Sequence, residues 1–290
     1  MFPEIVELPW IHVTIHSYGT LIVLAFLLGS WWAKRTAVRR LGVDGERVFN
    51  VCFILLFVGI FGARMVHAFG HYAEFTAKPM SFLAIWEGGL VLYGGVVAAL
   101  LFLAWYLPGR PELKGFALLD VLARATSLAL VLGWFASLMA GDDYGKPTES
   151  AFGLPAALFK DNTNAVKSVQ HIVGNAATTK LHASQIYGSL FALGVFLLLG
   201  LVSRRAKVSG RVAAVFLMVH SLGTAVLEIF RGDGKLQGER PYLIGSTAND
   251  LPAILSWGQF LAIPVFFTGV AIWLIRRPER DAAPMSAPTR

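Results

Sequence analysis

Apolar residues gather in seven long stretches along the chain, each followed by a connection that contains charged residues, glycine or proline. The stretches cover residues 16–33, 48–68, 90–107, 117–140, 186–203, 211–230 and 255–275. An α-helix needs about 20 predominantly apolar residues to cross the hydrocarbon core of a bilayer. The pattern therefore predicts an all-α polytopic membrane protein with seven transmembrane helices. Residues before the first stretch contain no Lys or Arg, so we expect that stretch to be a retained helix rather than a cleaved signal peptide.

The same pattern predicts the domain organisation. Residues 1–277 are expected to form one transmembrane domain, followed by a disordered tail over 278–290 that holds no further apolar stretch. The longest polar connection, 149–183, is rich in Asn, Thr, Ala and Lys and is expected to form a surface loop or cap.

Composition supports a membrane protein and excludes several other classes. Of the 290 residues, 56% are hydrophobic and only 15% are charged, whereas about a quarter of the residues of a soluble domain are charged. The single cysteine, Cys52, excludes an intrachain disulfide and a cysteine metal site. No metal-site, P-loop or hydrolase motif occurs, so no metal and no cofactor is expected.

Lys and Arg are distributed unequally between the two sides of the predicted bundle. Fifteen of them lie in the connections after the first, third and fifth stretches and in the tail, against seven in the N-terminal segment and the longer remaining connections. The positive-inside rule then places the N-terminus on the outer, periplasmic side and the C-terminus in the cytoplasm. Because this asymmetry accounts for the net charge of +7, no nucleic-acid partner is expected.

Polar residues within or beside the apolar stretches gather on the predicted outer side. Arg64 and Arg231 lie near the outer ends of the second and sixth stretches, where a cation is costly and usually faces a cavity or a partner. Glu228 precedes Arg231 by three residues and shares its helix face, so the two can form an ion pair or receive an anionic lipid headgroup.

The segment from Trp86 to Gly95 stands at the mouth of the third stretch. Its glycines either let two backbones approach closely or let amide groups face a ligand. Trp86 and Tyr93 are typical of residues that anchor at headgroup depth.

Other polar residues near the helix ends have two interpretations each. At the start of the fifth stretch, Ser184 is a plausible helix N-cap, and His182 and Gln185 beside it are alternatively ligand-binding residues. Asp120 and Arg124 are one helical turn apart and can pair. The adjacent acids Asp142 and Asp143 follow the fourth stretch, where we favour a solvated turn.

The chain resembles the bacterial prolipoprotein diacylglyceryl transferase family in the order of its motifs. The matching pieces span nearly the whole apolar region: His16-Ser17-Tyr18-Gly19, Gly62-Ala63-Arg64, Trp86-Glu87-Gly88-Gly89-Leu90, Tyr93-Gly94-Gly95, Tyr144-Gly145-Lys146-Pro147-Thr148, His182-Ala183-Ser184-Gln185-Ile186-Tyr187, Glu228-Ile229-Phe230-Arg231 and Trp257-Gly258-Gln259.

This resemblance implies an enzyme of the bacterial inner membrane. It implies transfer of a diacylglyceryl group from phosphatidylglycerol to the lipobox cysteine in the signal peptide of a prolipoprotein, with membrane lipids as surroundings. The implied catalytic residues are Arg64 and Arg231 on the phosphate, Tyr93 as the base, and Glu228 orienting Arg231. The implied substrate-binding residues are His16, Tyr18, Glu87, Gly88, Gly89, Gly94, Gly95, His182, Ser184 and Gln185.

The chain departs from the family pattern at several positions. Trp134 and Thr224 stand where the pattern has arginines of the catalytic cavity, and Gly188 stands where an acid usually follows the tyrosine. Losing two cations favours an alternative, a weakly active or inactive relative that binds phospholipid or lipoprotein signal segments. A transporter on the same fold is disfavoured because the charged residues cluster on one side.

Overall fold

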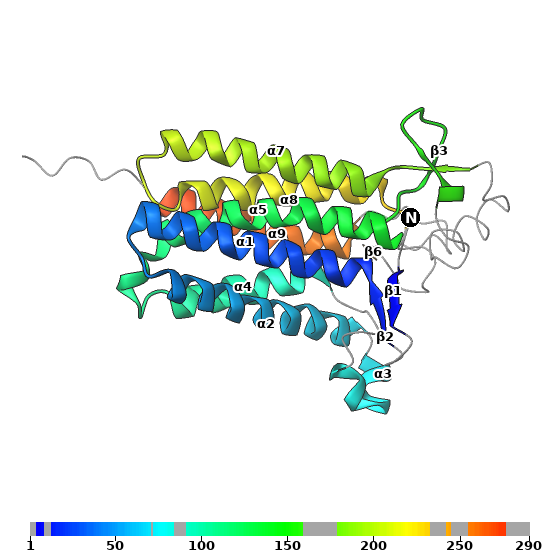
Figure 1. Cartoon of the computed structure of the whole chain (residues 1–290), viewed down its shortest axis with the longest axis horizontal. Helices are drawn as coiled ribbons and strands as arrows, with labels where there is room; N and C mark the ends of the chain where they lie inside the picture. The colour runs from blue at the N-terminus through cyan, green and yellow to red at the C-terminus, as the bar shows by residue number, and fades with distance from the viewer. Residues whose placement is uncertain are drawn as a thin grey trace, which may run out of the picture.

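A computed structural model of the chain contains a bundle of long helices lying side by side (Figure 1). It describes residues 4–8, 13–70, 72–83, 91–158, 179–232, 242–244 and 255–276. All seven predicted stretches form helices, which are α1 (Ser17–Leu41), α2 (Gly45–Gly70), α4 (Leu92–Tyr106), α5 (Gly115–Ala140), α7 (Ser184–Arg205), α8 (Arg211–Phe230) and α9 (Trp257–Ile275).

Six helices in the described part of the chain are long and apolar enough to cross a membrane, and α4 is a shorter apolar helix. The prediction of an all-α polytopic membrane protein is therefore confirmed. With 15 residues, α4 is about 22 Å long. Large apolar side chains point outward along the bundle, as Phe57, Leu190 and Leu201 do with more than half of their surface exposed. Such a surface is suited to lipid rather than water.

Close packing joins particular pairs of helices, some of which are distant in the sequence. Helix α1 packs against α5 and α2, α5 packs also against α7 and α8, and α2 and α8 pack closely with α4 and α9 respectively. Glycines bring α2 and α4 together: a Cβ on Gly62 would lie 2.6 Å from the carbonyl oxygen of Gly94, and one on Gly95 would lie 2.7 Å from that of Gly59. Small residues at such crossings let two backbones approach closely.

The short elements gather at one end of the bundle, which we name the strand end (Figure 1). They are the antiparallel hairpin β1 (Glu4–Leu8) and β2 (Val13–His16), helix α3 (Tyr72–Ala77), the 3-10 turns η1 (Pro79–Leu83) and η4 (Ala156–Leu158), the small sheet β3 (Pro147–Thr148), β5 (Lys180–Leu181) and β4 (Leu154–Pro155), and the pair β6 (Tyr242–Ile244) and β7 (Leu255–Ser256).

The opposite end, which we name the turn end, holds the short connections between α1 and α2, α4 and α5, and α7 and α8. The 3-10 turn η3 (Pro111–Leu113) lies in the second of these. Most of the described basic residues lie at this end, and some of them form ion pairs, such as Lys34 with Glu46 at 2.5 Å and Arg47 with Glu112 at 3.1 Å.

The predicted pairing of Asp120 with Arg124 is wrong. The Asp120 carboxylate instead accepts hydrogen bonds from the amides of Gly210 and Ala213, both at 2.8 Å, at the start of α8. A carboxylate is stabilised there because the amides of the first helical turn have no partners within the helix and the helix dipole is positive at this end. Arg124 points elsewhere, toward the aromatic rings of α1 and α7.

Candidate functional site

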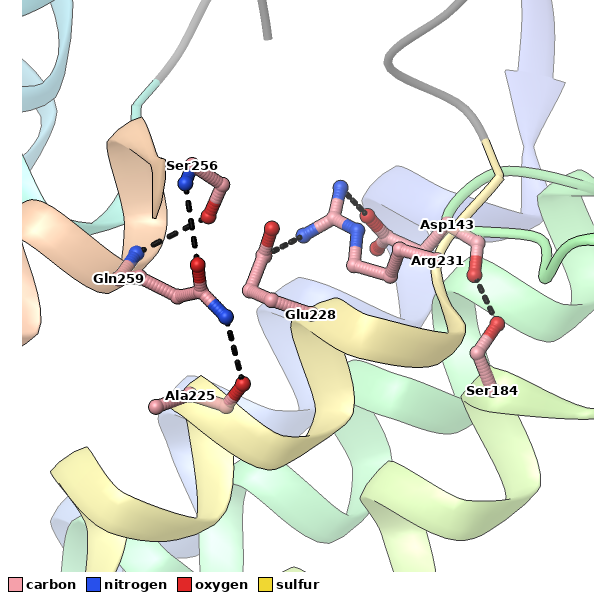
Figure 2. A network of polar contacts seen from close by, with 7 residues as sticks. All are labelled: Asp143, Ser184, Ala225, Glu228, Arg231, Ser256 and Gln259. Atoms are coloured by element: carbon pink, nitrogen blue, oxygen red, sulfur yellow. Dashed lines mark hydrogen bonds and ion pairs between the residues drawn. The ribbon is translucent and has the colours of Figure 1, made fainter. Parts of the chain in front are cut away.

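Four helix ends meet around Arg231 at the strand end (Figure 2). The guanidinium of Arg231, at the C-terminal end of α8, lies 2.9 Å from Oε1 of Glu228 and 2.8 Å from Oδ1 of Asp143. The three side chains are only 14–29% exposed. Two carboxylates from different elements therefore fix the position and plane of this cation, and the fork of its five donors allows both contacts at once.

Asp143 belongs to a turn that follows α5 and runs between α7 and α8. Gly141 ends α5 with a φ of 81°, and Asp143 itself has a φ of 53°, a region that Asp tolerates better than most residues. Asp143 was predicted as part of a solvated turn, and that prediction is wrong because its carboxylate is paired with Arg231. The sequence did contain a signal for this ion pair, because Asp143 and Arg231 both lie on the predicted outer side, each near the end of a helix.

Main-chain hydrogen bonds hold this turn on both sides. On the α7 side, Gly145 N donates to His182 O at 3.2 Å, and His182 N donates to Lys146 O at 2.9 Å. On the α8 side, Lys146 N donates to Phe230 O and Gly232 N donates to Tyr144 O, both at 2.9 Å. A Cβ on Gly232 would lie 2.6 Å from the carbonyl oxygen of Gly145, so the close approach requires glycine.

The first residues of α7 complete the support of the turn. Ser184 Oγ donates to the carbonyl oxygen of Asp143, and Gln185 Nε2 donates to that of Asp142 at 2.7 Å. The prediction that Ser184 caps α7 is therefore wrong: Ala183 holds the N-cap position, without a side-chain cap, and Ser184 is the first helical residue. Ser184 and Gln185 position the acid that holds Arg231.

His182 lies beside this network. Its ring packs against Phe230 and Tyr187, with centroids 5.2 and 6.3 Å away. Its Nδ1 atom and the Oε1 atom of Gln185 are both buried and have no hydrogen-bond partner among the described residues. Buried polar atoms normally have partners, so these two atoms offer positions at which a bound molecule can be recognised.

Helix α9 is fixed against the same site by a feature that the sequence analysis missed. Ser256 and Gln259 form a reciprocal capping box at its start, with distances of 3.0 and 3.1 Å. The Gln259 amide also donates to the carbonyl oxygen of Ala225 on α8 at 3.0 Å. A Cβ on Gly258 would come within 3.0 Å of the Glu228 carboxylate, so glycine leaves room for that group.

Arg64 forms a second cationic centre at the strand end. It is buried, and its Nε and Nη2 atoms donate to the carbonyl oxygens of Phe82 and Ser81 at 3.2 and 2.5 Å. Its guanidinium also lies 5.2 Å from the centre of the Phe75 ring. The cation thus ties η1 to the end of α2.

The remaining predicted site residues are placed only in part. Tyr18 lies in the first turn of α1, 44% exposed, near enough to Asp142 and Asp143 to interact electrostatically. Gly94 and Gly95 are buried in the contact between α4 and α2, in agreement with the interpretation that these glycines let two backbones approach closely. For His16 and Tyr93 only the backbone is described, in β2 and in the first turn of α4. Trp86, Glu87, Gly88 and Gly89 lie outside the described residues.

An apolar cavity of about 330 Å³ lies between α1, α2, α4, α5, α8 and α9. Leu92 and Val96 line it near the strand end, and Leu103 and Leu122 line it deeper in the bundle. Its size and lining are typical of sites for apolar ligands.

Two departures from the family pattern meet in the structure. The backbone of Gly188 on α7 lies against the indole ring of Trp134 on α5, so that a side chain at 188 would overlap the ring. The large aromatic residue and the missing acid are therefore coupled by packing. Thr224, the other position at which the pattern has an arginine, is buried in α8.

Comparisons with known proteins identify one family. The family model described as prolipoprotein diacylglyceryl transferase matches residues 3–275. Similar curated proteins are the phosphatidylglycerol–prolipoprotein diacylglyceryl transferases of Chromohalobacter salexigens (26% identical, covering 94% of this chain and 93% of the relative) and Polynucleobacter asymbioticus (27%, covering 92% and 93%). A third, from Symbiobacterium thermophilum, is 27% identical over 93% of this chain and 92% of the relative. These matches give no support to the alternative of an inactive relative.

Proposed function

The chain belongs to the prolipoprotein diacylglyceryl transferase family, and from this premise we propose that it transfers a diacylglyceryl group from phosphatidylglycerol to the lipobox cysteine of a prolipoprotein signal peptide. The single observation that carries the proposal beyond the family assignment is the Arg231 centre, a cation held rigidly by two carboxylates at a helix end. Its relatives' names state the same two substrates.

The reaction has simple requirements. The cysteine sulfur forms a bond to the terminal glyceryl carbon, while the bond from that carbon to the phosphate oxygen breaks and glycerol phosphate leaves with the electron pair. The thiol proton passes to a base, because the thiolate is the nucleophile. The site must therefore hold a phosphodiester, stabilise the charge on the leaving phosphate and accept a proton.

Arg231 is suited to the leaving phosphate. A pre-oriented guanidinium stabilises developing charge without having to reorganise during the reaction. Glu228 and Asp143 orient it through contacts of 2.9 and 2.8 Å. In this proposal Asp143, Ser184 and Gln185 are positioning residues, because they act on the substrate through Arg231 or through the turn that carries Asp143.

The other roles are proposed for residues that lie, like Arg231, at the strand end of the bundle. Arg64 provides a second cation for the phosphodiester, and Tyr93, at the start of α4, is the proposed base that receives the thiol proton. His182 and Gln185 present buried polar atoms to the headgroup or the peptide. His16, Tyr18 and the segment that includes Glu87, Gly88 and Gly89 are proposed to border the substrate.

The apolar cavity is proposed to receive acyl chains. It runs from Leu92 near the strand end into the middle of the bundle and is lined almost entirely by apolar side chains. A lipid whose headgroup lies at the strand end can place a chain there without exposing it to water, which is favourable in proportion to the apolar area buried.

The membrane arrangement is proposed from the charges. All seven helices cross the inner membrane within a single domain over 1–277, with the strand end and the N-terminus in the periplasm and the basic turn end and the C-terminus in the cytoplasm. The segment 149–183 then lies on the periplasmic side as a loop or cap, and 278–290 is a cytoplasmic tail.

A transfer assay tests this function. Purified protein in detergent is mixed with phosphatidylglycerol and a lipobox peptide, and the thioether product is followed by mass spectrometry. We expect product from the native chain, loss of product in Arg231→Ala, and unchanged product in Arg205→Ala, which alters an exposed arginine at the turn end. Absence of product from the native chain, with phosphatidylglycerol still bound, would overturn the proposal and leave a lipid-binding relative.

A further inference from the structure

A second cavity, of about 170 Å³, lies at the turn end, which is the opposite end of the bundle from the Arg231 centre. Helices α1, α5 and α7 and the connection that leads into α8 enclose it. Three cationic side chains line it, those of Arg40, Arg124 and Lys207, together with one carboxylate, that of Asp120. No role in the proposed transfer reaction involves these residues.

Arg124 extends into this region from within the bundle. It lies nine residues after the start of α5, about 14 Å along the helix. Its guanidinium is 4.8 Å from the ring centre of Trp32 on α1 and 5.1 Å from that of Phe196 on α7. A Cβ on Gly200 would lie 3.2 Å from its Nη2 atom. The aromatic rings and the glycine hold a guanidinium in one place between three helices.

The buried Nε atom of Arg124 has no hydrogen-bond partner in the part of the chain that the structure describes. A buried donor that lacks an acceptor costs free energy, and the cost is larger for a charged group. The aromatic rings offer electrostatic attraction but no hydrogen-bond acceptor in the plane of the guanidinium.

The surrounding charges leave this region positive. Arg40 and Arg204 lie near enough to repel the charge of Arg124. Asp120 does not compensate for them fully, because both of its oxygens accept amides at the start of α8 and Arg276 lies near it. Among the described residues, no carboxylate forms an ion pair with Arg40, Arg124 or Lys207.

We propose that the cavity lined by Arg40, Arg124 and Lys207 binds a phosphate group at the turn end of the bundle. A phosphate has several acceptor oxygens and a charge that the three cations lining one cavity can share, and arginine recognises it through paired donors. The source is either the headgroup of an anionic phospholipid of the adjacent leaflet or a small soluble phosphate. This site is separate from the proposed active site and stands whether or not the transfer function does.

Two binding measurements on purified full-length protein distinguish the sources. Native mass spectrometry measures retention of phosphatidic acid, with phosphatidylcholine as the neutral comparison, and calorimetry measures binding of inorganic phosphate. We expect Arg124→Gln to weaken binding of at least one of these phosphate probes by about tenfold, as loss of one charged hydrogen-bonding group predicts. The matched control is Arg205→Gln, an exposed arginine that does not line the cavity.

The pattern of losses identifies the ligand. Weakening for phosphatidic acid alone shows a lipid headgroup site, weakening for inorganic phosphate alone shows a soluble ligand, and weakening for both shows that the phosphate itself is recognised. Equal binding by Arg124→Gln and Arg205→Gln for both probes overturns the proposal. If Arg124→Gln fails to fold, Arg40→Gln combined with Lys207→Gln replaces it, because both side chains are exposed. The same criteria then apply.

Discussion

The backbone of Gly188 lies directly against the indole of Trp134, across the contact between α7 and α5. The family resemblance implies an acid and an arginine at these two positions, and in this chain both positions take part in one packing contact.

This contact predicts coupling between the two positions. We expect Trp134→Arg alone to destabilise the protein, because it places an arginine against an apolar interface. Adding Gly188→Glu should recover about 1–3 kcal/mol by supplying a partner. Thermal unfolding of the two single variants and the double variant in detergent measures the coupling. Gly194→Glu, on the same helix, is the control. Additive effects of the two changes would contradict the contact.

Gly62 and Gly59 provide a matched test of the crossing between α2 and α4. A Cβ on Gly62 would approach the backbone of Gly94, whereas one on Gly59 has nothing within 4 Å. We expect Gly62→Ala to lower the free energy of unfolding by about 1–3 kcal/mol through overpacking. Gly59→Ala should be neutral or slightly stabilising, because alanine is the better helix former. Equal melting temperatures for the two variants would show that the helices are not closely packed there.

Arg231→Lys tests the geometry of the cation separately from its charge. A lysine keeps the charge but lacks the planar fork that contacts Glu228 and Asp143 together. We expect the transfer rate to fall by about 100-fold, the scale of losing one oriented donor at a developing negative charge. Melting temperature should change little. Arg205→Lys serves as the control, and full activity of Arg231→Lys would show that charge alone suffices.

The start of α9 predicts an order of stability between two variants. Ser256→Ala removes one half of the capping box and should cost about 1 kcal/mol. Gln259→Ala should cost more, because its side chain also donates to Ala225 of α8. Chemical or thermal unfolding measures both. A larger effect of Ser256→Ala would mean that the link between α9 and α8 contributes little.

The helices could be predicted from the sequence because their apolar lengths are set by the bilayer rather than by distant contacts. All seven begin and end within a few residues of the expected positions, apart from an extension of α1 into its basic end. The ion pair of Glu228 with Arg231 was also predictable, because residues three apart on a helix share a face.

Contacts that depend on tertiary folding were not predictable in the same way. Asp120 was expected to pair with Arg124, its neighbour on the helix, but the start of α8 arrives at Asp120 and offers two amides. Asp143 reaches Arg231 only because the turn after α5 runs between α7 and α8. Ser184 was a plausible cap of its own helix, and instead its side chain donates a hydrogen bond to that turn. Each outcome depends on a segment distant in the sequence.

The shortness of α4 has a consequence for the membrane around the protein. At 15 residues, or about 22 Å, it falls short of a hydrocarbon layer about 30 Å thick. In the proposed arrangement, in which α4 crosses the membrane, either the bilayer beside α4 thins or the connection from α4 to α5 enters the hydrocarbon layer. In either case headgroups and water come closer to the middle of the bundle along α4 than along the longer helices. In that arrangement the thickness of the host membrane, and hence the length of its acyl chains, sets how close phospholipid headgroups come to the start of α4.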